Sequence, residues 1–217
     1  MIRGFCFDMD GVLFDSERVG YDILRRAALR QNAELTRDQW HSLLGASMAH
    51  TRQAIKTWYD GRVDADRFLA DWLEETLAYA RTEGIPLKPH ARETLDGLRW
   101  RGMRLALCTS NAPEVVDAYL GLSGLDRMLD QVVTGPMVAH GKPAPDIYLL
   151  GAQRLGLPPE ECAGVEDSFN GVRAVRAAGM YSVMVPDVLP YAAQWAPYVD
   201  LCLHDLSELE HAIWMKE

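Results

Sequence analysis

The sequence predicts an α/β protein: a parallel sheet with helices on both faces and an all-helical insertion after the first strand. Short apolar runs alternate with helical patterns along most of the chain, as strands and helices do in such a sheet. From about residue 15 to about residue 84 this alternation stops, and only helical patterns occur. The 217 residues, 48% of them hydrophobic, suffice for one large domain or one domain with an insertion.

The predicted strands are apolar runs bounded by turn residues, and several are apolar at every position, which is typical of strands buried on both faces. They are residues 2–7, 103–108, 131–134, 162–165, 181–185 and 201–203. Helices are predicted at residues 114–122, 146–155, 172–178 and 206–214, with a surface helix that begins near His90. This order of elements favours a sheet that is doubly covered.

The insertion carries apolar residues at helical spacing in three stretches, 21–31, 50–59 and 66–81. It is much longer than an ordinary connection between a strand and a helix. An all-helical insertion at this point can lie as a separate cap over the carboxyl edge of the sheet. We expect residues 1–14 and 87–217 to form the core and residues 15–86 to form the cap.

Charge and hydropathy exclude several classes of partner. The formal net charge is −9, whereas nucleic-acid binders need a basic surface. No apolar run reaches the length of a membrane span, and Asp8 comes too early for a signal peptide. The cysteines lie in or beside apolar segments without the spacing of a metal site; they are Cys6, Cys108, Cys162 and Cys202. We expect buried free thiols in a cytoplasmic protein that is a monomer, with a dimer as the alternative.

The stretch FCFDMDGV places Asp8 and Asp10 directly after the first predicted strand. Side chains alternate along a strand, so both carboxylates can point the same way. Gly11 permits the tight turn that follows. Read alone, the stretch also fits a helix-capping acid and a turn acid.

Polar residues end two further predicted strands. Thr109, Ser110 and Asn111 precede a helix N-terminus, which suits an anion but also fits an ordinary helix cap. Glu166 and Asp167 end the fourth run, and paired acids there cost free energy unless a cation offsets their repulsion. Two helix-capping acids are the alternative. Ligands of open α/β sheets bind at this carboxyl edge.

A lysine precedes two prolines in GKPAPD, where Lys142 stands on a stiff, extended segment. It could present a fixed positive charge to a phosphate. Because most lysines are merely solvated, this stretch alone is a weak indication.

Together, and in this chain order, the four stretches resemble the four motifs of the haloacid dehalogenase superfamily. The DxDG(V/T) opening, the helical insertion, KPxPD and (E/D)DSxxG are similar to its β-phosphoglucomutase-like phosphatase branch. The resemblance covers nearly the whole chain and is weak only in the cap. It implies a Rossmann-like core with an all-α cap, and hydrolysis of a small phosphorylated metabolite such as a sugar phosphate.

The resemblance also implies roles for the acids. Asp8 would be the nucleophile that becomes an aspartyl phosphate, and Asp10 the general acid and then base. The carboxylates of Asp8 and Asp167 and the backbone carbonyl of Asp10 would hold Mg²⁺, with Glu166 as an additional ligand.

The phosphate oxygens would be held by Thr109 and Lys142, and Ser110 and Asn111 would also bind the phosphate, so that catalysis is mostly positioning and electrostatics. A cis Lys142-Pro143 bond is expected from the same resemblance.

Alternatives remain open. β-Phosphoglucomutases carry a histidine where Gly20 stands, and an arginine in a cap loop where residues 45–48 offer Met48, so hydrolysis is favoured over phosphoryl transfer. Dehalogenation would leave Asp10 and the acid pair Glu166-Asp167 unexplained. A non-catalytic binding protein would be expected to lack some of these residues.

Some residues of the predicted cap could face the site, although each also fits a solvated or core helix position; they are Met48, His50, Arg52 and Lys56. The aromatic residues Trp58, Trp72 and Tyr79 fit the core spacing of helices.

Overall fold

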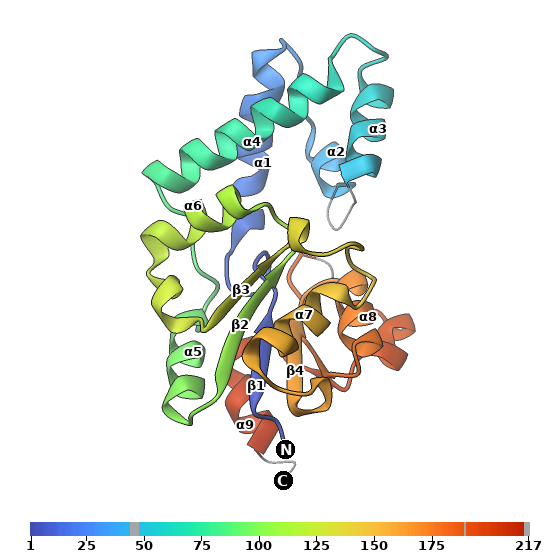
Figure 1. Cartoon of the computed structure of the whole chain (residues 1–217). Coiled ribbons are helices and arrows are strands. Elements are labelled where there is room, and N and C mark those ends of the chain that lie inside the picture. The colour runs from blue at the N-terminus through green and yellow to red at the C-terminus, as the bar shows by residue number, and fades with distance from the viewer. Residues whose placement is uncertain (44–47, 189, 215–217) are drawn as a thin grey trace.

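The computed structural model describes residues 1–43, 48–188 and 190–214 (Figure 1). Its centre is a parallel sheet with the strand order β3-β2-β1-β4-β5-β6. The strands are β1 (Gly4–Phe7), β2 (Arg104–Thr109), β3 (Gln131–Thr134), β4 (Cys162–Glu166), β5 (Tyr181–Met184) and β6 (Leu201–Cys202). The chain builds outward from β1 on one side and from β4 on the other. The carboxyl ends of β1 and β4 therefore flank the switch point, where open α/β sheets bind ligands.

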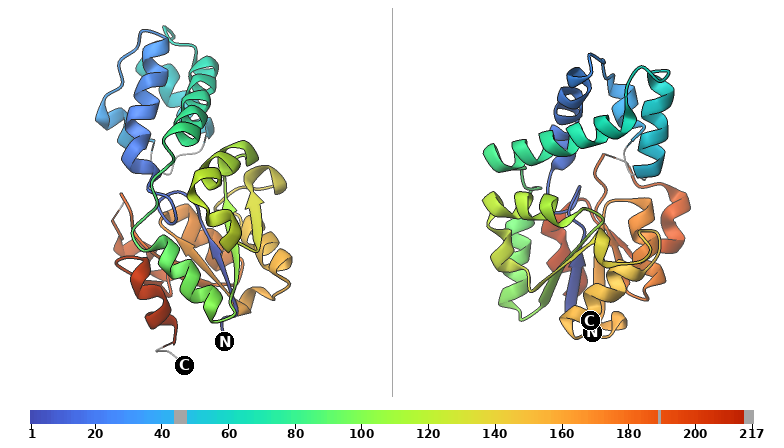
Figure 2. Two further views of the ribbon diagram at one scale, coloured as in Figure 1. Left: turned by 90° about the vertical axis from the view of Figure 1, so that its left-hand side faces the viewer. Right: turned by 45° about the horizontal axis from the view of Figure 1, so that its top comes forward.

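Helices cover both faces of this sheet (Figures 1 and 2). They are α5 (Ala91–Trp100), α6 (Pro113–Ser123), α7 (Asp146–Leu155), α8 (Phe169–Ala177) and α9 (Leu209–Trp214). Short 3₁₀ helices connect them: η1 (Leu125–Met128), η2 (Gly135–Met137), η3 (Pro159–Glu161), η4 (Ala193–Tyr198) and η5 (Leu206–Glu208). The α/β prediction is thus confirmed.

The two faces of the sheet have separate apolar cores, because side chains alternate along each strand. Phe5 and Phe7 of β1 pack with α5, α6 and α9. Cys6, between them, packs with α7 and α8 in the cluster that also contains Tyr148. Three of the cysteines are buried and free, as expected, but Cys202 is exposed, so the prediction for it is wrong. It lies in a two-residue edge strand with a neighbour on one side only.

The helical insertion comprises α1 (Ser16–Arg30), α2 (Arg37–His41), α3 (Met48–Trp58) and α4 (Ala65–Thr82), and it lies beyond the carboxyl ends of the strands (Figures 1 and 2). Apolar side chains of these helices, among them Leu24, Ile55 and Phe68, form their own cluster. The sequence pattern missed α2, although Thr36 and Gln39 form a capping box that marks its start.

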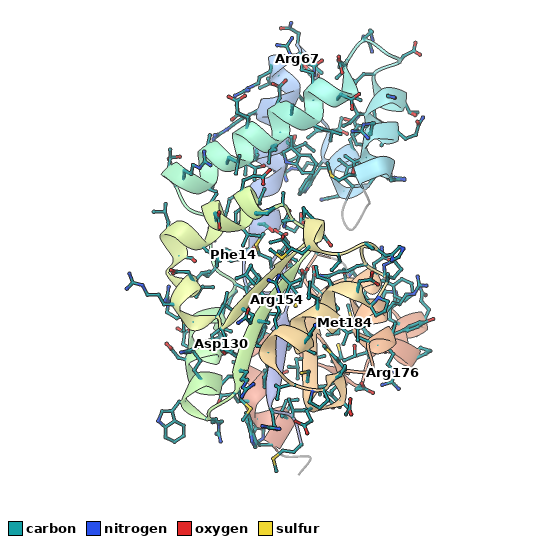
Figure 3. The ribbon with its side chains drawn as sticks, in the orientation of Figure 1. Phe14, Arg67, Asp130, Arg154, Arg176 and Met184 are labelled. Carbon is teal, nitrogen blue, oxygen red and sulfur yellow. The ribbon has the colours of Figure 1, made fainter. Side chains whose placement is uncertain are left out.

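The two ends of the insertion leave the core side by side. The backbone N–H of Asp15 donates to the carbonyl of Pro86 at 2.8 Å, and that of Lys88 donates to Leu13 at 3.0 Å. Phe14, labelled in Figure 3, is completely buried at this junction and forms a β-bridge with Leu87. Within the described ranges, no helix has the length and apolarity needed to cross a membrane.

Candidate active site

Carboxylates gather where β1 and β4 end. Asp8 follows β1, and its backbone N–H donates to the carbonyl of Val165 in β4 at 2.9 Å. This bond aligns the ends of the two strands, so that carboxylate oxygens of Asp8, Glu166 and Asp167 lie within 4.8 Å of one another. Gly11, at φ +71°, passes directly against the carboxylate of Asp167, and a Cβ there would collide with it.

Lys142 is the cation of this cluster. Its Nζ lies 2.7 Å from Oδ1 of Asp8 and 2.7 Å from Oε1 of Glu166, and it donates to the carbonyl of Cys108 at 3.1 Å. The lysine precedes Pro143 across a cis peptide bond, as expected. Burial alone would lower its pKa, but Asp8 and Glu166 raise the pKa above its ordinary value. Lys142 therefore remains charged in spite of its burial.

Glu166 is fully buried and holds Lys142 in place. The Tyr148 hydroxyl donates to its Oε1 at 2.6 Å, and the Ser168 hydroxyl donates to its Oε2 at 3.1 Å. Sequence reasoning missed Tyr148, because an aromatic residue at a buried position of α7 fits ordinary core spacing.

Asp10 is held by Asn111, whose Nδ2 donates to Oδ2 of Asp10 at 2.5 Å and to Oγ1 of Thr109 at 3.1 Å. Burial raises the pKa of Asp10, while hydrogen bonds from Ser16 and Asn111 act in the opposite direction. Asn111, predicted to contact phosphate, therefore contacts the predicted acid in this structure. Ser110 beside it is exposed.

The electrostatics of the cluster suit a divalent cation. Burial raises the pKa of Asp8 to about 7; Lys142 opposes this shift, while Glu166 and Asp10 add to it. Burial and the charges of Glu166, Asp8 and Asp187 raise the pKa of Asp167. A bound cation would relieve this crowding, and an all-oxygen donor set fits the preference of Mg²⁺. Among the described residues, the carboxylates of Asp8, Glu166 and Asp167 lie close enough together to hold such a cation, and the backbone carbonyl of Asp10 stays a predicted ligand.

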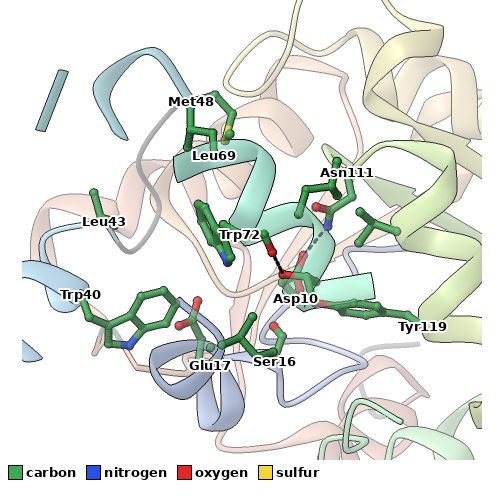
Figure 4. Close-up of a pocket in the computed structure, with 15 residues that line it drawn as sticks. Asp10, Ser16, Glu17, Trp40, Leu43, Met48, Leu69, Trp72, Asn111 and Tyr119 are labelled. Carbon is green, nitrogen blue, oxygen red and sulfur yellow. Dashed lines mark hydrogen bonds between the residues drawn. The ribbon is translucent and has the colours of Figure 1, made fainter. Parts of the chain in front are cut away.

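A cavity of about 320 Å³ opens beside Asp10, between the core and the helices of the insertion (Figure 4). Trp40, Trp72 and Tyr119 line it, as does Glu17, a residue that sequence reasoning did not single out. Trp72 also packs against the apolar clusters of the core and of the insertion, so its helical spacing correctly indicated a core position. The spacing did not reveal that the same side chain also lines the cavity.

The insertion residues singled out from the sequence are divided between this cavity and the surface. Met48 lines the cavity, whereas Arg52 makes an ion pair with Asp66 at 2.7 Å. His50 and Lys56 are exposed. Trp58 packs in the cluster of the insertion and Tyr79 against the core, as their spacing indicated. Residues 45–47 of the predicted cap loop, which contain no arginine, lie outside the described residues.

Gly20 of α1 lies against the indole of Trp40. A Cβ at Gly20 would approach Cη2 of Trp40 to 2.6 Å and Cζ2 to 2.7 Å. The indole therefore occupies the space into which a larger side chain at position 20 would extend.

Comparison with known proteins agrees with the fold and the site described above. The family described as haloacid dehalogenase-like hydrolase matches residues 2–179, and the chain belongs to it. Hexitol phosphatase A of Escherichia coli is 35% identical over 214 residues, which are 95% of this chain and 93% of the relative. Fructose-1-phosphate phosphatase YqaB of the same organism is 31% identical, with 84% and 95% covered.

A solved structure extends this similarity to three dimensions. CbbY from Rhodobacter sphaeroides, in complex with phosphate, has a TM-score of 0.80 at 25% identity, with 96% of each chain covered. The particular enzyme class follows from family and relatives together: this protein is a phosphoric monoester hydrolase.

Proposed function

We propose that the protein is a Mg²⁺-dependent phosphatase that hydrolyses a sugar phosphate or sugar-alcohol phosphate through a phosphorylated Asp8. The observation that carries this proposal is the position of Asp8, which lies 2.7 Å from Lys142 and within the carboxylate cluster of Glu166 and Asp167. The names of the phosphatase relatives given above support the substrate class.

In the first step, a carboxylate oxygen of Asp8 bonds to phosphorus, and the bond from phosphorus to the alcohol oxygen breaks. Asp10 donates a proton to that departing oxygen. Burial favours the protonated form of Asp10, and Asn111 fixes its carboxyl group. In the second step, Asp10 removes a proton from water as the water attacks phosphorus, which releases phosphate and regenerates Asp8.

Charge is the main obstacle, because the carboxylate of Asp8 must approach an anionic phosphate. Lys142 lies next to the attacking oxygen and supplies a fixed positive charge. Thr109 and Asn111 complete the polar rim at the end of β2. When bound to the carboxylates of Asp8 and Asp167 and the backbone carbonyl of Asp10, with Glu166 as an additional ligand, Mg²⁺ would offset the remaining repulsion by acting as a Lewis acid. Because Glu166 already accepts from Tyr148 and Lys142, we assign it chiefly to positioning Lys142.

Residues 15–86 would act as a cap and residues 1–14 and 87–217 as the catalytic core. The separate apolar cluster of the insertion and the paired backbone bonds at its two ends support this division. A cap over the site excludes water and bulky substrates during the chemical steps. A phosphorylated macromolecule is for this reason a poor substrate, and a small metabolite a good one.

Hydrolysis is favoured over mutase chemistry because of Gly20 and Trp40. The indole of Trp40 fills the space that a histidine at position 20 would need. Dehalogenation would leave Asp10, which Asn111 holds, and the acid pair Glu166-Asp167 unexplained. A non-catalytic binding protein would be expected to lack some of these residues. A cytoplasmic monomer stays a prediction.

The test is hydrolysis of 4-nitrophenyl phosphate by the purified protein with Mg²⁺, with EDTA, and as the Asp8→Asn variant. We expect activity only in the native protein with Mg²⁺. Circular dichroism should show that the Asp8→Asn variant is folded. Undiminished turnover in EDTA or by Asp8→Asn would remove the mechanism. Transfer of phosphate to added glucose 1-phosphate would favour the mutase alternative instead.

A further inference from the structure

Glu17 is the unexplained polar residue of the cavity. It lies in the first turn of α1 and lines the cavity together with Asp10, Trp40 and Trp72 (Figure 4). Its Oε2 atom is buried, and in the described part of the chain no group donates a hydrogen bond to it. Leaving a buried oxygen without a hydrogen-bond partner costs free energy, so a ligand that supplies the missing partner gains affinity.

The chemical steps proposed above leave Glu17 unused. Proton transfer is assigned to Asp10, and the charged groups that contact Asp8 and the metal cluster come from other elements. Burial raises the pKa of Glu17 to about 8, and the nearby charges of Asp10, Asp187 and Asp15 add to this shift. The carboxyl group can therefore both donate and accept a hydrogen bond at neutral pH, as an alcohol hydroxyl requires.

The charge of the cavity limits what can occupy it. Among the described residues that line it, none is basic, and Asp10 and Glu17 carry carboxyl groups. A substrate with a carboxylate or a second phosphate in the cavity would bury that anion without a counter-ion, which is strongly unfavourable. The aromatic faces of Trp40, Trp72 and Tyr119 instead suit the C–H surfaces of a neutral carbon skeleton.

We infer that Glu17 is a specificity-determining residue: it hydrogen-bonds a hydroxyl group of the organic part of a phosphate monoester whose remainder is polyhydroxylated and uncharged. This inference rests on the proposed phosphatase function and deepens it. It assigns a substrate contact to α1 and excludes metabolites with a second anionic group. An aryl phosphate has no hydroxyl group for Glu17, so its hydrolysis depends only on the catalytic core.

The test compares Glu17→Ala and Glu17→Gln with the native protein on two kinds of substrate. Sorbitol 6-phosphate, mannitol 1-phosphate, glucose 6-phosphate and fructose 1-phosphate supply hydroxyl groups, and 4-nitrophenyl phosphate supplies none. For the best polyol substrate, we expect Glu17→Ala to lower kcat/KM by about 10- to 100-fold. The same variant should change kcat/KM for 4-nitrophenyl phosphate by less than about threefold, because this substrate has no hydroxyl group that Glu17 could bind. Glu17→Gln keeps a donor and an acceptor and should recover most of the loss.

A second comparison needs no variant. Gluconate 6-phosphate matches sorbitol 6-phosphate except that a carboxylate replaces one terminal alcohol, and the native protein should hydrolyse it at least about tenfold less efficiently. Equal losses on both substrate kinds in Glu17→Ala, or equal rates with gluconate 6-phosphate, would overturn the inference, as would preference for 4-nitrophenyl phosphate over every polyol. Absence of any Mg²⁺-dependent hydrolysis would instead defeat the phosphatase proposal itself.

Discussion

The Nζ atom of Lys142 lies 2.7 Å from Oδ1 of Asp8, although 134 residues separate them in the chain. The contact follows from topology, because β1 lies in the middle of the sheet and Asp8 stands at its carboxyl end. Lys142 comes from the loop between β3 and α7, and this loop also lies at the carboxyl edge of the sheet. Glu166, at the end of β4, fixes the lysine there.

Lys142→Met should lower kcat by about 100-fold or more, because it removes a preorganised charge beside the attacking oxygen. Kinetics with 4-nitrophenyl phosphate under saturating Mg²⁺ measure the loss. Arg176→Met is the matched control, since it removes the cation of an exposed ion pair with Asp200 at 2.8 Å. Equal activity of the two variants would contradict the role of Lys142.

Asp10→Asn should reduce kcat far more than it raises KM, because the amide cannot transfer the proton. Asn111→Ala should reduce kcat less, since it removes the hydrogen bonds to Asp10 and Thr109 but leaves the proton-transferring carboxyl group in place. Steady-state kinetics separate the two parameters. A variant of Asp10 that changed only KM would show that this residue binds substrate without acting as an acid or base.

Gly20→Ala should lower Tm, although alanine favours helices more than glycine does. The new Cβ would lie 2.6 Å from the Trp40 indole, and this overlap outweighs the gain in helix propensity. Gly121→Ala on α6 is the control: a Cβ there meets nothing within 4 Å, and the variant should be stabilised by about 1 kcal/mol. If both variants were stabilised, Trp40 would have room to move.

Glu17→Gln should make stability less sensitive to pH. The pKa of Glu17 is about 8 in the folded protein and 4.5 ordinarily, so between these values the folded state keeps a proton that the unfolded state has released. The free energy of unfolding therefore falls as pH rises through this interval, and the glutamine variant avoids that loss. In thermal unfolding of the metal-free proteins, the Tm of Glu17→Gln relative to that of the native protein should be higher at pH 8 than at pH 4.5.

The control for this comparison is Glu93→Gln, which changes an exposed glutamate in the first turn of α5. It should leave the pH dependence of Tm as it is in the native protein. Parallel curves for native protein and Glu17→Gln would show that Glu17 is already ionised in the folded state.

The fold was readable from the sequence because its signals are local. Apolar runs identified each strand of the described residues, and the ends of two of those strands identified acids that gather at the site, such as Asp8 and Asp167. Lys142 lies in a loop and was indicated by the GKPAPD stretch together with the other three motifs. The contacts of Tyr148 and Glu17 were not readable, because a buried aromatic residue and a glutamate near a helix start occur in many folds. Only the tertiary arrangement shows that one holds Glu166 and the other faces the cavity.

The neck formed by the bonds of Asp15 with Pro86 and of Lys88 with Leu13 bears on how such a protein changes over evolutionary time. The chain leaves the core and returns to it at neighbouring positions, so the helical insertion between them could be replaced as one unit. A longer, shorter or differently shaped insertion could take its place without changing the order of the strands in the sheet. Preference for one metabolite over another could then diversify while the reaction chemistry stayed constant.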